Sequence, residues 1–253
     1  MITVITGASS GIGASLAYRF ARDGHTLALI ARREKKLSDV VDRCHELGGK
    51  AVVYPCDITD KQAVKACVEQ ILDELGEVDT FIANAGISLS SEGQVFNAYV
   101  FEKTWKTNLI GHSYFLERLI PVMTKRGSGH LVGIGSLASY RGLPGAGAYC
   151  SSKAAMVSLF ESLRIDLKPY GICVSMINPG YIKTPLTDKN RFFMPFLMET
   201  EEGVSHIYRA IKKKKALFAF PKPIVWALRL SRCVPIFLFD RVISRFKNVK
   251  DPQ

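Results

Sequence analysis

The sequence predicts an α/β protein: one doubly wound domain in which helices cover both faces of a mostly parallel sheet. Short apolar runs, as expected of strands, alternate with helical patterns from residue 2 to about residue 177. The runs are nearly continuous in apolar residues, which is typical of strands that are buried on both faces. A glycine-rich turn follows directly after the first run. Since ligands bind such sheets at the carboxyl ends of the strands, we expect the functional site there.

The individual elements follow from the same pattern in order. A β-rich run opens the chain, and the glycine turn leads from it into a helix that ends near residue 23. Further apolar runs and helical stretches then alternate, and each crossover is expected to be right-handed. The expected strands are 2–6, 27–31, 51–54, 80–83, 129–135 and 172–177, and the later helices span 33–47, 60–75, 100–126 and 149–169.

The alternation is expected to break down after Pro179. A loop rich in Phe, Met and Pro covers residues 184–199, and a short helix, the run Lys212–Lys215 and an apolar, basic tail come after it. We therefore divide the chain into a sheet domain of residues 1–200 and a C-terminal segment of residues 201–253 that completes this domain.

The composition is that of ordinary globular protein. The chain has 253 residues, of which 47% are apolar and 23% charged, a size and balance that suit one α/β domain. The six cysteines form no C-x-x-C pair, so we expect neither a metal site nor a disulfide framework. Scattered cysteines are typical of a reducing compartment, which predicts a cytoplasmic protein.

The glycine turn is the first candidate binding site. Thr6-Gly7-x-x-x-Gly11-x-Gly13 follows a strand and opens a helix. Glycines allow a tight turn and the close approach of a pyrophosphate, and the helix N-terminus offers free N–H groups and a positive dipole end. The pattern predicts a Rossmann-type dinucleotide site formed by Gly7, Ser9, Ser10, Gly11, Ile12 and Gly13. A tight strand–helix turn without a ligand is the alternative.

Two arginines stand where the second strand ends. An acidic residue at this place binds the ribose hydroxyls of NAD(H), whereas arginine suits the 2′-phosphate of NADP(H). Here Arg32 and Arg33 come first and Glu34 follows them. The sequence therefore favours NADP(H), with Arg32 as the first candidate for the phosphate and Arg33 as the second. The alternative is a solvated start of the next helix.

Polar and small residues follow the third and fourth strands. Asp57, which precedes Ile58, could accept a hydrogen bond from the adenine amino group, or it could be a turn or N-cap residue. Asn84, Ala85 and Gly86 follow the fourth strand, where small residues allow close approach to the cofactor. We expect both segments to line the dinucleotide site.

Tyr149 and Lys153 form the candidate catalytic pair. They are four residues apart at the start of a helix, so they share one face, and Ser136 follows the fifth strand. A tyrosine with a pKa near ~10 is a poor general base at neutral pH, and a nearby ammonium lowers that pKa. Ser136 can hydrogen-bond a substrate oxygen, and Asn108, in the long helix, could hold a water that links Lys153 to solvent. Taken singly, each could be an ordinary helix or turn residue.

Together these motifs resemble the short-chain dehydrogenase/reductase family over about residues 1–190, ending with Asn178-Pro179-Gly180. The resemblance implies a catalytic tetrad of Asn108, Ser136, Tyr149 and Lys153, of which Tyr149 and Lys153 also contact the cofactor. It further implies that the nicotinamide end meets Pro179, Gly180, Ile182 and Thr184, with Ile182 at the carboxamide. After about residue 200 the chain departs from the family's compact ending, which leaves the substrate and the oligomer type open.

The predicted function is hydride transfer between NADP(H) and a carbonyl or alcohol, with Tyr149 as general acid/base. A catalytically silent dinucleotide-binding scaffold or sensor, recruited by its basic tail, is the alternative, and the presence of Ser136, Tyr149 and Lys153 argues against it. Bulky aromatic residues and adaptable methionines at 192–198 predict that the loop of residues 184–199 is a lid over an apolar, lipid-like substrate. Ordinary packing of a short helix would explain them equally well.

The C-terminal segment is basic and amphipathic. Residues 203–253 hold 12 Lys/Arg and 2 Asp/Glu of a chain whose net charge is +11. Apolar residues recur at helical spacing from Ile224 to Phe246, interrupted by arginines and by Pro235, so a spanning helix is not expected. The segment could lie on the anionic inner face of a membrane, or pack in the interface of a homodimer or homotetramer; a nucleic-acid partner is not expected.

Overall fold

The computed structural model describes residues 1–89, 96–190 and 192–245. Its centre is a seven-stranded sheet in the order β3-β2-β1-β4-β5-β6-β7, and all the neighbouring strands are parallel. The predicted doubly wound parallel sheet is therefore confirmed. The strands are β1 (Ile2–Thr6), β2 (Thr26–Ala31), β3 (Lys50–Pro55), β4 (Thr80–Ala83), β5 (Gly129–Ile134), β6 (Ile172–Pro179) and β7 (Leu217–Phe220).

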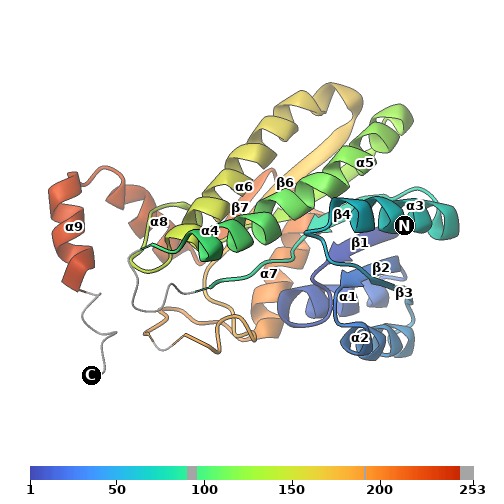
Figure 1. Cartoon of the computed structure of the whole chain (residues 1–253), viewed down its shortest axis with the longest axis horizontal. Helices are drawn as coiled ribbons and strands as arrows, with labels where there is room; N and C mark the ends of the chain where they lie inside the picture. The colour runs from blue at the N-terminus through green and yellow to red at the C-terminus, as the bar shows by residue number, and fades with distance from the viewer. Residues whose placement is uncertain (90–95, 191, 246–253) are drawn as a thin grey trace.

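Helices cover both faces of the sheet, as Figure 1 shows. One layer contains α1 (Gly11–Arg22), α2 (Glu34–Glu46) and α7 (Thr200–Lys212). The other contains α3 (Lys61–Leu75), α4 (Ala98–Trp105), α5 (Gly111–Arg126) and α6 (Gly147–Asp166).

Alternation along the strands divides the core into these two layers. Val4 and Ala28 pack in the layer of α3 and α5, whereas Ile5 and Leu29, the next residue of each strand, pack in the layer of α1 and α2. Because side chains on both faces are buried, these strands are continuous apolar runs without a polar face. This is the physical reason why they could be predicted from hydropathy.

Two expectations about secondary structure were wrong. The alternation does not break down after Pro179, because β7 adds one more parallel strand beside β6. The expected helix 100–126 is divided by a π-helical turn, η1 (Lys106–Ile110), which contains Asn108. Single π turns of this kind occur frequently at functional sites.

After β7, the C-terminal segment continues into two helices on either side of Pro235: α8 (Lys222–Ser231) and α9 (Ile236–Arg245). Phe246, the last apolar residue of the predicted amphipathic pattern, lies outside the described residues. The described part of the predicted lid, residues 184–199, consists of turns and extended chain. In the described ranges, no helix combines the length and the apolar character that crossing a membrane requires.

Candidate active site

The turn between β1 and α1 requires its glycines. Gly7 and Gly11 have φ angles of +68° and +55°, a region that L side chains rarely adopt. A Cβ on Gly13 would lie 2.4 Å from the carbonyl oxygen of Gly7, so only glycine lets α1 start this close to the strand. The Ser10 side chain makes no hydrogen bond to the first turn of α1, which leaves the N–H groups there to an anionic ligand.

The segment after β4 is tied to this turn. The Thr6 hydroxyl accepts hydrogen bonds from the N–H groups of Asn84 (3.0 Å) and Ala85 (3.2 Å), and Asn84 Nδ2 donates to the Thr6 carbonyl at 2.9 Å. Buried His112, which the sequence analysis missed, lies with Nε2 2.9 Å from the Ala85 carbonyl oxygen. Burial lowers the pKa of His112 to about 4, so its neutral ring donates to Ala85 through Nε2.

Cationic side chains surround the end of β2. A guanidinium nitrogen of Arg33 donates to Ser9 Oγ at 2.8 Å and to Ser10 Oγ at 3.0 Å, which places its charge on the glycine turn. The Arg32 side chain is 67% exposed, and its guanidinium lies 3.9 Å from the Asp57 carboxylate. Burial raises the pKa of Asp57, but hydrogen bonds from the Thr59 N–H and hydroxyl outweigh this effect and hold it below its ordinary value.

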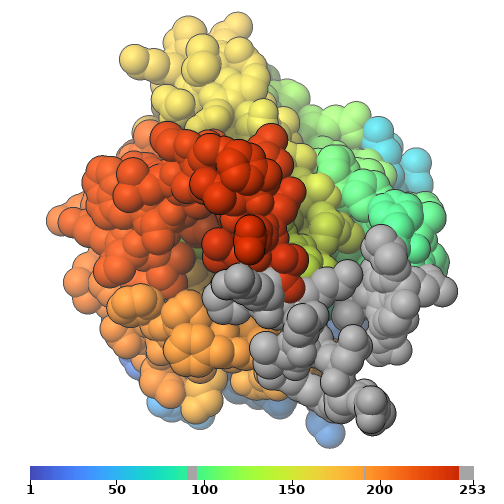
Figure 2. Space-filling model, turned by 90° about the vertical axis from the view of Figure 1, so that its left-hand side faces the viewer, coloured from blue at the N-terminus to red at the C-terminus, as the bar shows by residue number. Residues whose placement is uncertain are grey.

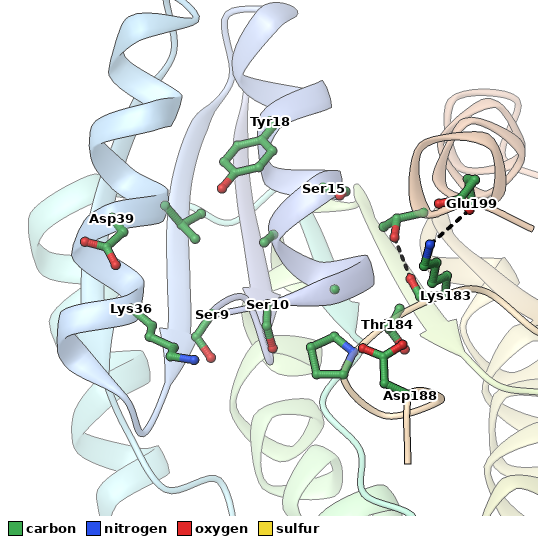
Figure 3. A pocket seen from close by; sticks show the side chains of 15 residues that line it. Ser9, Ser10, Ser15, Tyr18, Lys36, Asp39, Lys183, Thr184, Asp188 and Glu199 are labelled. Atoms are coloured by element: carbon green, nitrogen blue, oxygen red, sulfur yellow. Dashed lines mark hydrogen bonds and ion pairs between the residues drawn. The ribbon is translucent and has the colours of Figure 1, made fainter. Parts of the chain in front are cut away.

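A further cation that the sequence analysis missed is Lys36. It lies on α2 at the rim of a shallow pocket of about 640 Å³ on the outer side of the glycine turn. In Figure 3 its side chain points toward Ser9, while the Lys183–Glu199 ion pair lies on the other side of the pocket. Its position in the sequence offers no signal, because a lysine five residues after the end of β2 is simply in the first turn of the next helix.

Asn108 joins α6 to the segment after β4. Its side chain is fully buried; Oδ1 accepts from the Ile87 N–H at 2.8 Å, and Nδ2 donates to the Ile87 carbonyl and to Ser152 Oγ, both at 3.0 Å. These bonds give Asn108 a positioning role in this structure. Its expected part in holding a water beside Lys153 stays a prediction.

Lys153 lies between the ends of two strands. Its side chain is 4% exposed, and Nζ donates to the Ile134 carbonyl at the end of β5, at 2.9 Å. A Cβ on Gly86 would lie 3.5 Å from the same Nζ, so the segment after β4 passes directly beside the ammonium. Burial lowers the pKa of Lys153 to about 8, because the charged form is poorly solvated there.

Tyr149 lies one turn before Lys153 on α6 and is half-buried. Burial raises the pKa of its phenol above the ordinary value, and an interaction with the Ser136 hydroxyl partly opposes this rise. Lys153 Nζ is 6.0 Å from the centroid of the Tyr149 ring and is directed at Ile134. The lowering of the Tyr149 pKa by Lys153, expected from the sequence, is therefore not the dominant effect; the tyrosine is protonated at neutral pH.

The segment after β6 passes in front of the glycine turn. A Cβ on Gly11 would lie 3.2 Å from the Thr184 side chain, and the Gly180 N–H donates to the Phe220 carbonyl at 2.7 Å. The Ile182 side chain packs in the core against Gly203, so any contact of this residue with a cofactor has to come from its backbone.

These segments enclose a cleft of about 430 Å³ at the carboxyl edge of the sheet. Most of the predicted residues line it: Gly7, Ser9, Ser10, Gly11, Ile12, Arg32, Arg33, Asp57, Ile58, Asn84, Ala85, Gly86, Tyr149, Lys153 and Thr184. Other predicted residues are not among its lining, namely Gly13, Asn108, Ser136, Pro179, Gly180 and Ile182. A glycine turn, arginines and a buried lysine along one elongated cleft fit a nicotinamide dinucleotide. Nowhere in the described ranges do three His, Cys, Asp or Glu side chains gather as ligands for a metal ion.

Comparison with known proteins decides the family. A family model described as short chain dehydrogenase matches residues 1–193. The chain belongs to the short-chain dehydrogenase family. Proteins of this family are oxidoreductases that bind a nicotinamide dinucleotide and act on small molecules, so the coarser part of the predicted function is confirmed.

Relatives of similar length share this architecture. An uncharacterized oxidoreductase of Myxococcus xanthus is 35% identical, with 96% of each chain covered. Estradiol 17-beta-dehydrogenase 11 of Mus musculus is 30% identical, over 98% of this chain and 84% of the mouse protein. Among solved structures, a short-chain dehydrogenase from Sphingobium yanoikuyae in complex with NADPH is 30% identical, with a TM-score of 0.80 over 91% of this chain and 93% of that one.

Proposed function

We propose that this short-chain dehydrogenase transfers a hydride between NADP(H) and the carbonyl or alcohol group of an apolar substrate, with Tyr149 as general acid/base. The observation that carries the proposal is the grouping of Tyr149, Ser136 and Lys153 at the carboxyl end of β5, beside the cleft. Names of relatives point the same way: one is an estradiol dehydrogenase and another a ketoacyl reductase.

The preference for NADP(H) rests on charge. Arg32 and Arg33 follow β2 without an acidic residue at the strand end, and Arg33 is already directed at the serines of the glycine turn. Arginine forms charge-assisted bonds to phosphate, whereas a carboxylate at this place would repel it. The similar structure from Sphingobium yanoikuyae holds NADPH.

The chain's own residues supply the proton chemistry. When bound, NADP(H) supplies or accepts the hydride. Burial keeps the Tyr149 phenol protonated, which is the form that donates a proton to the oxygen of a carbonyl under reduction. Ser136 can hydrogen-bond the same oxygen, and the Lys153 ammonium, anchored on Ile134, favours the phenolate that remains.

The test follows NADPH oxidation against a panel of small and long-chain ketones. Tyr149→Phe should lower turnover by at least ~100-fold, the lower end of a general-acid contribution, while NADPH still binds. Tyr170→Phe is the matched control, because Tyr170 is 54% exposed in a short turn after α6 and should tolerate the change. Near-normal turnover of Tyr149→Phe would refute the assignment. Binding of NADPH without oxidation by any ketone would favour the silent scaffold.

A further inference from the structure

Helices α8 and α9 form a face at the carboxyl edge of the sheet. Strand β7 is parallel to β6, so the chain leaves it at the edge where the cleft opens, and α8 begins at Lys222. A Cβ on Gly180 would lie 2.8 Å from Cδ of Pro221, so the start of α8 directly adjoins the segment after β6. Figure 2 shows both helices, in red, in the middle of this side of the molecule.

The outward side of this α8–α9 face is apolar. In α8 only Val225 is buried, whereas Trp226 and Leu230, one helical turn apart, are 59% and 64% exposed. In α9, Ile236 and Phe237 are 73% and 71% exposed. Large apolar side chains that gather on a surface in this way mark the contact site of a partner or of a lipid surface.

Basic side chains accompany the apolar ones. Lys222 and Arg229 are exposed on α8, and the Arg229 guanidinium lies 5.7 Å from the centroid of the Trp226 ring. Arg241 is exposed on α9, next to Asp240, the one acidic residue in the sequence from 222 to 245. A tryptophan beside an arginine, on helices that expose apolar residues, is typical of helices that lie in the headgroup region of an anionic bilayer.

The lysine run Lys212–Lys215 lies elsewhere. It precedes β7, and therefore lies at the amino edge of the sheet, where Lys212 forms an ion pair with Asp23 at 2.8 Å. The positive charge of the C-terminal segment is thus divided between two edges. At the carboxyl edge the basic side chains accompany four large apolar side chains that are 59% to 73% exposed, whereas Leu217, beside the lysine run, is 42% exposed. Charge and exposed apolar surface together therefore favour the α8–α9 face.

We propose that the α8–α9 face docks onto the surface of an anionic lipid bilayer and turns the carboxyl edge of the sheet toward it. Arg232 Nε donates to the Tyr140 carbonyl at 3.1 Å, and the Arg141 guanidinium stacks 3.7 Å from the centroid of the Phe239 ring. These contacts join the docking helices to the segment that leads to Tyr149. Docking itself does not depend on the proposed reaction.

Vesicle sedimentation tests the docking with the full-length protein. The wild type should pellet with vesicles of phosphatidylcholine and phosphatidylglycerol, but not with phosphatidylcholine alone, and less at high salt. Arg229→Gln with Arg241→Gln should weaken binding about 30-fold, from ~1 kcal/mol per basic side chain near such a surface. Lys213→Gln with Lys215→Gln removes the same charge at the opposite edge and should leave binding nearly unchanged.

The apolar contribution has its own readout. Emission of Trp226 should shift to the blue on addition of anionic vesicles, and Trp226→Phe should abolish the shift while binding persists. Three outcomes would overturn the proposal: a wild type that stays in the supernatant with all vesicles, equal weakening by the two charge pairs, or a Trp emission that does not respond. If the double substitution Trp226→Asn and Leu230→Asn instead halves the molecular mass of the protein in solution, and leaves its sedimentation with anionic vesicles unchanged, the face binds a second copy of the chain.

Discussion

Replacing Lys153 with methionine should remove a pH-dependent part of the stability. The folded protein lowers the pKa of Lys153 from 10.5 to about 8 through burial. Between these two pH values the unfolded chain binds a proton that the folded chain has lost, so the free energy of unfolding rises with pH. Below the lower value both states are protonated and the slope vanishes. At ~1.4 kcal/mol per pH unit, the rise amounts to about 3 kcal/mol.

The assay is urea denaturation of the wild type and of Lys153→Met at intervals from pH 7 to pH 10.5, without cofactor. The difference in unfolding free energy between the two proteins cancels the titration of other groups. It should increase in favour of the wild type by about 3 kcal/mol across this window. The lost hydrogen bond to Ile134 adds only a constant offset. A difference that is independent of pH would refute the reasoning and show that the ammonium is well solvated in the folded protein.

Four other substitutions test the site. Arg33→Gln should weaken the binding of NADPH by ~10-fold or more, because a charge-assisted hydrogen bond contributes ~1.5–3 kcal/mol, and it should leave the binding of NADH unaffected in parallel titrations. Arg32→Gln should act in the same direction. An equal loss of affinity for both cofactors would count against a phosphate contact. Asn108→Ala should lower the free energy of unfolding, measured by urea denaturation, by ~2–5 kcal/mol, because it removes the side chain that bonds the Ile87 N–H and carbonyl. A change below ~1 kcal/mol would mean that water replaces the amide. Gly13→Ala should lower the free energy of unfolding by ~1–3 kcal/mol and weaken cofactor binding, because its Cβ would lie 2.4 Å from the Gly7 carbonyl oxygen. An unchanged melting temperature and unchanged cofactor affinity would show that the turn can relax.

The central strands and the cofactor motif were predictable because their signals are local. Each central strand is buried on both faces and therefore appears as an apolar run, and Gly7 and Gly11 adopt conformations that few other residues tolerate. Strand β7 gave no comparable signal. It has four residues at the edge of the sheet, Leu217 is exposed, and a lysine run precedes it. Only pairing with β6 makes it a strand.

Contacts between distant elements were not predictable from spacing. The π turn at Asn108 lies within a continuous helical pattern, and the hydrogen bonds of Asn108 to Ile87 become visible only in three dimensions. The approach of Arg33 to Ser9 likewise depends on how β2 pairs with β1. The sequence also presents the C-terminal charge as one basic block, whereas β7 carries the chain between its two halves across the sheet.

The course of β7 has a practical consequence for attaching other proteins or labels. Because β7 delivers the chain to the edge where the cleft opens, a label attached to an exposed position after Pro221 would lie on the cleft side of the molecule. Met1, by contrast, precedes β1 and lies at the amino edge, on the far side from Tyr149. A fluorescent protein or affinity tag fused ahead of Met1 leaves the α8–α9 face free, which makes it the preferable position for any measurement on vesicles.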